Sequence, residues 1–174
     1  SFMSNLLVVM ILLPLVGALV VALLGSSRPT DVRWVTLGTT LATLVVSLVV
    51  VGKFQTPATE QVAKEIMLPQ MQLQVPWLQY GLGDGGTAKI EAYLGIDGLS
   101  LGLVALTTIL MVSSVLVSWT AVTNRVAQFY AWLLILEAGL LGVFCAFDLI
   151  LFYVFFEFTL IPLFFLIGIW GGAK

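Results

Sequence analysis

Five long apolar runs, separated by polar turns, form the main pattern of this sequence. Each run is close to the roughly 20 apolar residues that a helix needs to cross a bilayer core of about 30 Å. The pattern therefore predicts an all-α polytopic membrane protein in which residues 1–174 form a single membrane domain. We expect its five transmembrane helices at about 6–24, 34–51, 99–120, 128–147 and 149–170.

Two prolines, Pro14 and Pro162, fall inside these runs. Membrane helices tolerate an internal proline when neighbouring groups or water satisfy the carbonyl that the proline frees. We therefore expect kinks rather than breaks at both positions. The first run has no basic segment before it and no small-residue cleavage site, which predicts a retained helix rather than a signal peptide.

The segment at 53–97, between the second and third runs, differs from the rest of the chain and holds five of the nine acidic residues. Apolar and polar residues alternate at 71–75 and again at 89–94, and glycines between 81 and 86 supply turn residues. This pattern predicts a small β-hairpin on the outer membrane surface. An irregular loop is the alternative, because Pro76 and Gly83 allow several strand registers.

The composition indicates what surrounds the chain and which residue types could carry its chemistry. Hydrophobic residues make up 60% and charged residues 9%, with a mean hydropathy of +1.13, so lipid is the expected surrounding of most residues. The seven lysines and arginines are scattered and the net charge is -2, which argues against a nucleic-acid partner. With no histidine and a single cysteine, Cys145, we expect no metal site, iron–sulfur cluster, haem or flavin. Any chemistry then rests on carboxylates.

The positive charges predict how the chain lies in the membrane. Arg28 and Arg33 join the first two runs, Arg125 joins the third and fourth, and Lys174 follows the fifth. Short loops rich in lysine and arginine face the cytoplasm. We therefore expect the Lys174 end in the cytoplasm, and the N-terminus and the hairpin outside.

Two glutamates, Glu137 and Glu157, lie deep inside the fourth and fifth runs. Each is about ten residues from the turn near Phe147, which places it about 15 Å deep, close to the midplane. Ionisable residues at this depth are costly and mark functional sites. We predict that Glu157 is a buried proton carrier and that Glu137 is a neighbouring relay or a tuning charge. Whether the two face each other depends on helix rotation, and a packing role stays open for both.

Three further residues have predicted structural roles. Asp97 and Asp148 come just before the third and fifth runs, where a carboxylate can accept hydrogen bonds from free backbone N–H groups and complement the helix dipole. Pro162 lacks an N–H, which frees the carbonyl of Phe158, next to Glu157. That carbonyl is either a water anchor or the site of a kink that serves packing only.

Two stretches resemble a known family. They are Ile96-Asp97-Gly98-Leu99-Ser100-Leu101 and the run LEAGLLGVFCAFDLILFYVFFEFTLIPLFFLIGIWG at 136–171. Both are similar to the M-type (chain 4) antiporter-like subunits of NADH:quinone oxidoreductase, which is respiratory complex I. The resemblance extends over essentially the whole chain, which would correspond to the N-terminal part of such a subunit.

The resemblance implies a core of fourteen helices with two inverted five-helix repeats, each holding a proton half-channel. It assigns the essential glutamate of the fifth helix to Glu157 and a fourth-helix glutamate to Glu137. The partner lysines of the seventh and eighth helices of the family would lie beyond Lys174. The implied partners are the L-, N- and K-type membrane subunits, and the implied location is the bacterial inner membrane.

The prediction is therefore a proton-translocating membrane subunit of a bacterial NADH:quinone oxidoreductase. A Mrp-type Na⁺/H⁺ antiporter or a hydrogenase-linked pump subunit is an alternative, because the same Glu157 would serve there. A non-conducting structural or assembly fragment, with structural acids, is a third possibility. The sequence leaves all three open.

Overall fold

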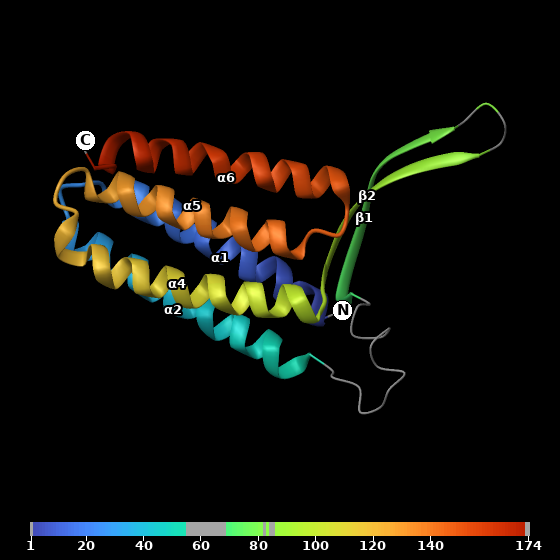
Figure 1. Ribbon diagram of the computed structural model, residues 1–174, viewed down its shortest axis with the longest axis horizontal. Coiled ribbons are helices and arrows are strands. Elements are labelled where there is room, and N and C mark those ends of the chain that lie inside the picture. The colour runs from blue at the N-terminus through green and yellow to red at the C-terminus, as the bar shows by residue number, and fades with distance from the viewer. Residues whose placement is uncertain (1, 55–68, 82, 84–85, 173–174) are drawn as a thin grey trace.

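The computed structural model describes residues 2–54, 69–81, 83 and 86–172, and shows a helical bundle with a β-hairpin at one end (Figure 1). Within this part of the chain, five helices are long and apolar enough to cross a membrane. The predicted fold class is confirmed. In chain order the elements are α1 (Phe2–Leu24), α2 (Pro29–Lys53), β1 (Gln70–Gly81), β2 (Thr87–Ile96), α4 (Gly98–Ala121), α5 (Val126–Cys145) and α6 (Leu149–Trp170).

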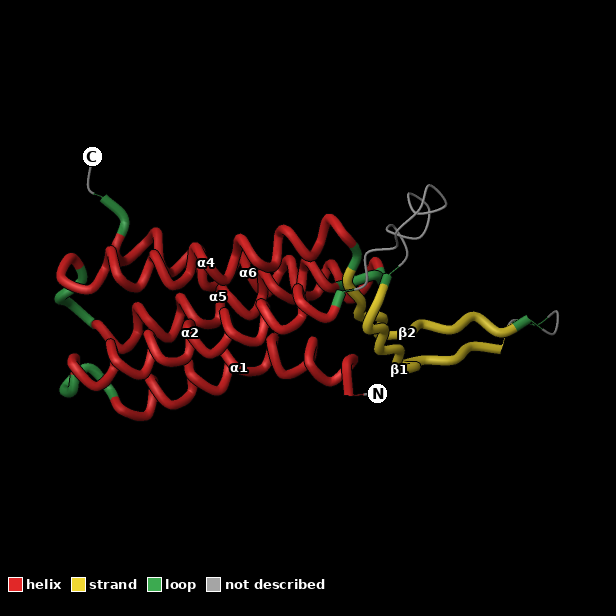
Figure 2. The backbone as a smooth tube through the Cα atoms, turned by 90° about the horizontal axis from the view of Figure 1, so that it is seen from below, coloured by secondary structure: helices red, strands yellow, loops and turns green. Residues whose placement is uncertain are grey.

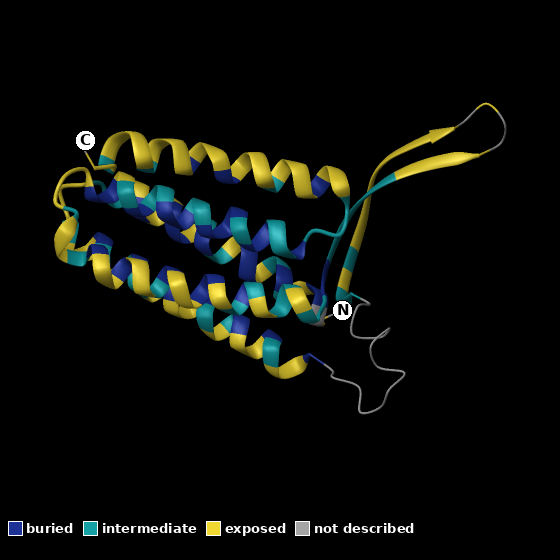
Figure 3. Cartoon of the chain, in the orientation of Figure 1, coloured by how far each residue is buried: buried dark blue, intermediate teal, exposed yellow. Residues whose placement is uncertain are grey.

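Helix α5 is the centre of the bundle. It packs against α1, α2, α4 and α6, and most of its residues are buried or half-buried (Figure 3). Helix α6 lies at the edge of the bundle, where it packs on α5 and leaves most of its surface exposed (Figure 3). Of the five described helices, α6 therefore has the least covered apolar surface.

Small residues set how closely α5 and α6 approach. A Cβ atom added at Gly142 would lie 2.6 Å from Cγ of Phe155, and one added at Gly139 would lie 2.7 Å from Cγ2 of Thr159. Membrane helices pack closely where small residues let the backbones approach, because lipid supplies no hydrophobic force between them. The two glycines thus fix which face of each helix lies in the contact.

The predicted hairpin is present, and its strands are longer than the alternation indicated. Strands β1 and β2 pair antiparallel, with irregular register between Pro76 and Leu78. Proline cannot donate to the strand ladder, which explains a bulge beside it. The alternative of an irregular loop is wrong for these residues. Positions 55–68 of the predicted extramembrane segment lie outside the described residues.

The base of the hairpin is joined to the turn between α5 and α6. The backbone N–H of Phe147 donates to the carbonyl oxygen of Tyr93 at 2.8 Å, and Leu94 forms a bridge with Ala146. Ile96, the last residue of β2, is fully buried among the helix ends. The distal part of the ribbon projects away from the bundle (Figure 2).

Several helix boundaries differ from the approximate ones predicted, including the start of α1, at Phe2 instead of about residue 6. Helix α5 ends at Cys145 rather than Phe147, because Ala146 and Phe147 pair with β2 instead of continuing the helix. Helix α2 begins at Pro29 rather than Trp34. This earlier start is explained by Pro29, because proline is favoured in the first turn of a helix. The helix also continues beyond its apolar residues into the polar surface of the membrane.

The arrangement of the two ends agrees in part with the predicted topology. The N-terminus and the hairpin lie at one end of the bundle and the C-terminus at the other (Figure 1, Figure 2). Helices α1 and α6 continue through Pro14 and Pro162, so neither proline breaks its helix. Which end faces the cytoplasm stays a prediction.

Candidate functional site

Glu137 is the one glutamate that the bundle encloses among the residues described for α5 and α6. Its side chain is 0% exposed, and neither carboxyl oxygen has a hydrogen-bond partner in the described part of the chain. A buried polar group without a partner costs free energy, about 1–3 kcal/mol for a neutral group. An orphaned pair of oxygens at this depth therefore calls for a functional or structural reason.

Glu157 lies on the opposite side of α6 from the contact with α5. Phe155 and Thr159 face the glycines of α5, and Glu157 is two residues from each. Two residues correspond to about 200° around a helix, so Glu157 points away from the bundle. No helix of the described part of the chain covers the Glu157 side chain, which is exposed, and its role as a buried proton carrier stays a prediction.

The two glutamates lie at the same depth but face different surroundings. Glu137 is eight residues before Cys145, where α5 ends, and Glu157 is eight residues after Leu149, where α6 begins. Each is therefore about 12 Å from the hairpin end of its helix at 1.5 Å per residue. Glu137 is also about 200° around α5 from Gly139, so it faces the bundle interior rather than α6. The structure does not bring the two carboxylates together.

The predicted caps have the expected geometry. The carboxylate of Asp97 accepts a hydrogen bond from the backbone N–H of Ser100 at 2.7 Å, at the start of α4. Asp148 accepts one from the backbone N–H of Leu151 at 3.0 Å, at the start of α6. Both carboxylates satisfy donors that the first helical turn leaves free.

Pro162 is buried in the contact between α6 and α5, on the same face as Thr159. Its packing role is therefore visible in the structure. The carbonyl of Phe158, which Pro162 leaves without its helical partner, lies one residue after the exposed Glu157.

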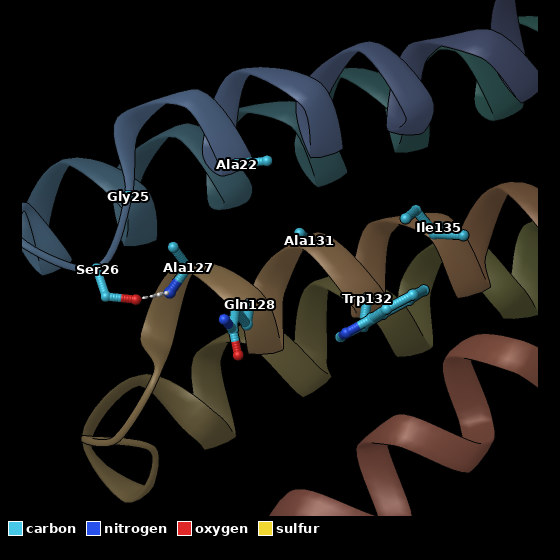
Figure 4. Close-up of a pocket in the computed structure, with 8 residues that line it drawn as sticks. All are labelled: Ala22, Gly25, Ser26, Ala127, Gln128, Ala131, Trp132 and Ile135. Atoms are coloured by element: carbon cyan, nitrogen blue, oxygen red, sulfur yellow. Dashed lines mark hydrogen bonds between the residues drawn. The ribbon is translucent and has the colours of Figure 1, made fainter.

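A cleft that the sequence analysis did not predict lies at the other end of the bundle, where the α1–α2 turn meets the start of α5 (Figure 4). It measures about 450 Å³, and the hydroxyl of Ser26 at its edge accepts a hydrogen bond from the backbone N–H of Ala127 at 3.4 Å. Small side chains leave this space, so clustered alanines in apolar runs were the available signal. Its lining residues are Ala22, Gly25, Ser26, Ala127, Gln128, Ala131, Trp132 and Ile135.

Comparison with curated proteins identifies relatives along nearly the whole chain. The chain is 37% identical over 165 residues to "NADH-ubiquinone oxidoreductase chain 4" of Marchantia polymorpha, covering 95% of this chain and 30% of that protein. It is 37% identical over 176 residues to "NADH-quinone oxidoreductase subunit M" of Rhodobacter capsulatus, covering 99% and 31%. The subunit M of Pseudomonas aeruginosa is 38% identical over 167 residues, covering 95% and 31%.

Comparison with solved structures finds the same fold. A chain of the "membrane-bound sulfane sulfur reductase (MBS), an archaeal respiratory membrane complex" matches with a TM-score of 0.62 at 19% identity, covering 91% of this chain and 22% of that one. At this identity the likeness shows the fold alone. No family model matches the chain.

These relatives are oxidoreductase subunits, so the Mrp-type and hydrogenase-linked alternatives are not favoured. The chain spans 30 to 31% of the length of these three curated relatives. Since identities of 37 to 38% extend over 95 to 99% of its residues, the chain is a homologue, over about a third of their length, of the proteins called NADH-quinone oxidoreductase subunit M or chain 4.

Proposed function

We propose that this chain is part of a subunit that moves protons across a membrane, in a complex that passes electrons from NADH to a quinone. The observation that carries the proposal is the pair of glutamates at equal depth inside two apolar helices. A carboxyl group at bilayer depth is costly, and such groups recur in proton relays. The relatives named above support the assignment to this kind of complex.

Glu157 is the proposed proton carrier. A carboxyl group takes up or releases a proton when a nearby cation moves or when its hydration changes. On the exposed face of α6, Glu157 is open to such a partner, whereas lipid would disfavour its charged form. We infer that protein or water, rather than lipid, covers this face in the assembled membrane. The freed carbonyl of Phe158 is a suitable water anchor beside it.

Glu137 is proposed as a neighbouring relay or a charge that tunes Glu157. The two side chains face different surroundings, which supports an electrostatic influence through α5 and α6 more than a direct transfer of a proton between them. The electrostatic interaction between two charges falls off only in proportion to their separation, so it extends well beyond hydrogen-bond distance. A change of charge at one glutamate therefore alters the proton affinity of the other.

The proposed surroundings follow from topology and family. Arg28, Arg33 and Arg125 lie near the turn end opposite the hairpin, and Lys174 follows α6 in the sequence, so we assign this end to the cytoplasm. The N-terminus and the hairpin then face outward across a bacterial inner membrane. L-, N- and K-type subunits are the proposed neighbours.

The test is to measure proton pumping and quinone reduction side by side with Glu157→Gln and Glu157→Asp in the full-length protein. Glutamine keeps the shape but cannot titrate, so we expect pumping to be lost with Gln and retained in part with Asp. Asp148→Asn is the matched control, because it removes a carboxylate from the end of the same helix while keeping the cap. Normal pumping by Glu157→Gln would show that Glu157 is a packing residue.

A further inference from the structure

The cleft between α1 and α5 runs from the end of the bundle opposite the hairpin into its apolar part (Figure 4). Along α5 its lining extends from Ala127 to Ile135, which is eight residues, or about 12 Å at 1.5 Å per residue. Ala22 and Ser26 on the opposite wall are exposed, so the cleft opens to the surroundings of the described bundle. For helices that span a membrane, those surroundings are lipid.

The deep part of the cleft has small, apolar walls. Ala22, Ala127 and Ala131 leave the space open because their side chains end at Cβ. Trp132 completes one wall and is held in place by its stack on Phe165 of α6, with ring centroids 4.6 Å apart. Water finds no hydrogen-bond partners in an apolar space of this kind. The deep part therefore favours a hydrocarbon chain as its occupant.

The mouth of the cleft, at the α1–α2 turn, is polar and positively charged. Ser26 and Gln128 line it. Arg28 of the same turn is paired with Asp31, with 2.9 Å between the guanidinium Nε and the carboxylate. Arg125, just before α5, is exposed and has no ion pair in the described part of the chain. Arg125 is therefore the arginine at this mouth whose charge is available to an anion.

The start of α5 favours an anion at the same place. Arg125 is the N-cap residue of α5, and its side chain makes no cap hydrogen bond. Its Cα is at most about 7.6 Å from that of Ala127 in the cleft wall. The N–H of Ala127 has a long bond of 3.4 Å to the Ser26 hydroxyl. A cation beside the positive end of a helix dipole is unfavourable by itself, and an anion between them relieves it.

We propose that this cleft binds one anionic phospholipid, with its phosphate group at Arg125 and the first turn of α5, and with an acyl chain along Ala131 and Trp132. Basic pockets between membrane helices at the cytoplasmic side recur as sites for anionic headgroups, and we assign this end to the cytoplasm. Arginine also suits phosphate, because it donates two parallel hydrogen bonds. The inference rests on membrane insertion and not on proton transfer, so its failure is distinguishable from a failed pumping experiment.

Trp132 permits a direct test, because it lines the cleft. The full-length protein is placed in phosphatidylcholine bilayers in which a fraction of either phosphatidylglycerol or phosphatidylcholine carries brominated acyl chains, since bromine quenches tryptophan fluorescence on contact. The difference between wild type and Trp132→Phe isolates the emission of Trp132. We expect phosphatidylglycerol to bind about fivefold more tightly than phosphatidylcholine at this residue, which corresponds to about 1 kcal/mol for one arginine. Arg125→Gln should remove this preference.

Lys53→Gln is the matched control, because it removes one exposed positive charge from the hairpin end of α2, and it should keep the preference. Ala131→Leu fills the cleft without changing any charge and should abolish the preference. Ala22→Leu fills it from the exposed wall and serves the same purpose if the first variant does not assemble. If Trp132→Phe does not assemble, mass spectrometry of the solubilised protein should find one bound phosphatidylglycerol that Arg125→Gln and Ala22→Leu lose.

Two results would overturn the proposal. A preference that survives filling of the cleft would show that anionic lipid, or its phosphate group alone, is attracted to the basic surface without entering the cleft. Equal quenching of Trp132 by the two brominated lipids in the wild type, or no quenching by either, would show that the cleft selects no anionic lipid or that protein covers it in the full-length chain.

Discussion

Replacing Gly142 by alanine is expected to push α6 away from α5. Gly142 packs against the ring of Phe155, and the added Cβ would lie 2.6 Å from Cγ, the ring atom closest to the backbone. The ring cannot avoid the methyl group by turning its far end, so the side chain as a whole has to move. Since α6 packs on α5, this contact decides how α6 is held.

The size of the effect follows from two opposing terms. Forcing an extra carbon into a packed contact costs about 1–3 kcal/mol. Alanine is also a better helix residue than glycine by about 0.8–1.0 kcal/mol. Gly38→Ala is the matched control, because Gly38 lies inside α2 with no atom within 4 Å of an added Cβ. Both variants gain the higher helix propensity of alanine, so this contribution cancels when they are compared. We therefore expect Gly142→Ala to be less stable than Gly38→Ala by about 1–3 kcal/mol.

The assay is reversible unfolding of the full-length protein in mixed detergent micelles. Trp132 of α5 stacks on Phe165 of α6 with ring centroids 4.6 Å apart, so its fluorescence reports on this contact. We also expect lower pumping in Gly142→Ala, because Glu157 lies on the displaced helix. Equal stability of the two alanine variants would refute the conclusion that close glycine packing positions α6.

Three further predictions concern the cap, the polar contact and the topology. Asp148→Ala should lower the unfolding free energy by about 0.5–2 kcal/mol through loss of the cap, whereas Asp148→Asn should cost much less; equal losses would contradict capping. The hydroxyl oxygens of Ser47 of α2 and Thr108 of α4 lie 2.9 Å apart. A double-mutant cycle with Ser47→Ala and Thr108→Val should give a coupling of about 0.6 kcal/mol, the mean for such pairs in membrane proteins, and zero coupling would exclude a useful bond. Cysteine at Ser27 should react with an impermeant thiol reagent only from the cytoplasmic side and cysteine at Thr87 only from outside, and the reverse pattern would overturn the assigned orientation.

The sequence predicted the elements well where one local pattern determines them. Apolar runs of membrane length identified all five helices of the described chain, because each backbone N–H and C=O in lipid has to be satisfied within its own segment. Alternating residues around a glycine turn identified the hairpin. The sequence misplaced the end of α5, because pairing of Ala146 with β2 is a long-range contact that no local pattern records.

Only part of the candidate site could be predicted from the sequence. The depth of Glu137 and Glu157 follows from counting residues, because the rise of a helix is fixed by its backbone. The caps at Asp97 and Asp148 follow from residue type and position. The contact between the hydroxyls of Ser47 and Thr108 was not predicted, since these residues come from separate helices whose alignment depends on how they pack.

The sequence by itself therefore determined the membrane class, the helices and the depth of the two carboxylates. Only the tertiary structure decided that Glu137 faces the bundle interior and that Glu157 faces outward. Helix α6 is apolar on nearly every side, so no hydrophobic stripe marks its packed face. Its rotation is set instead by the fit of Phe155 and Thr159 against two glycines of α5, a contact between surfaces that the order of residues alone does not bring together.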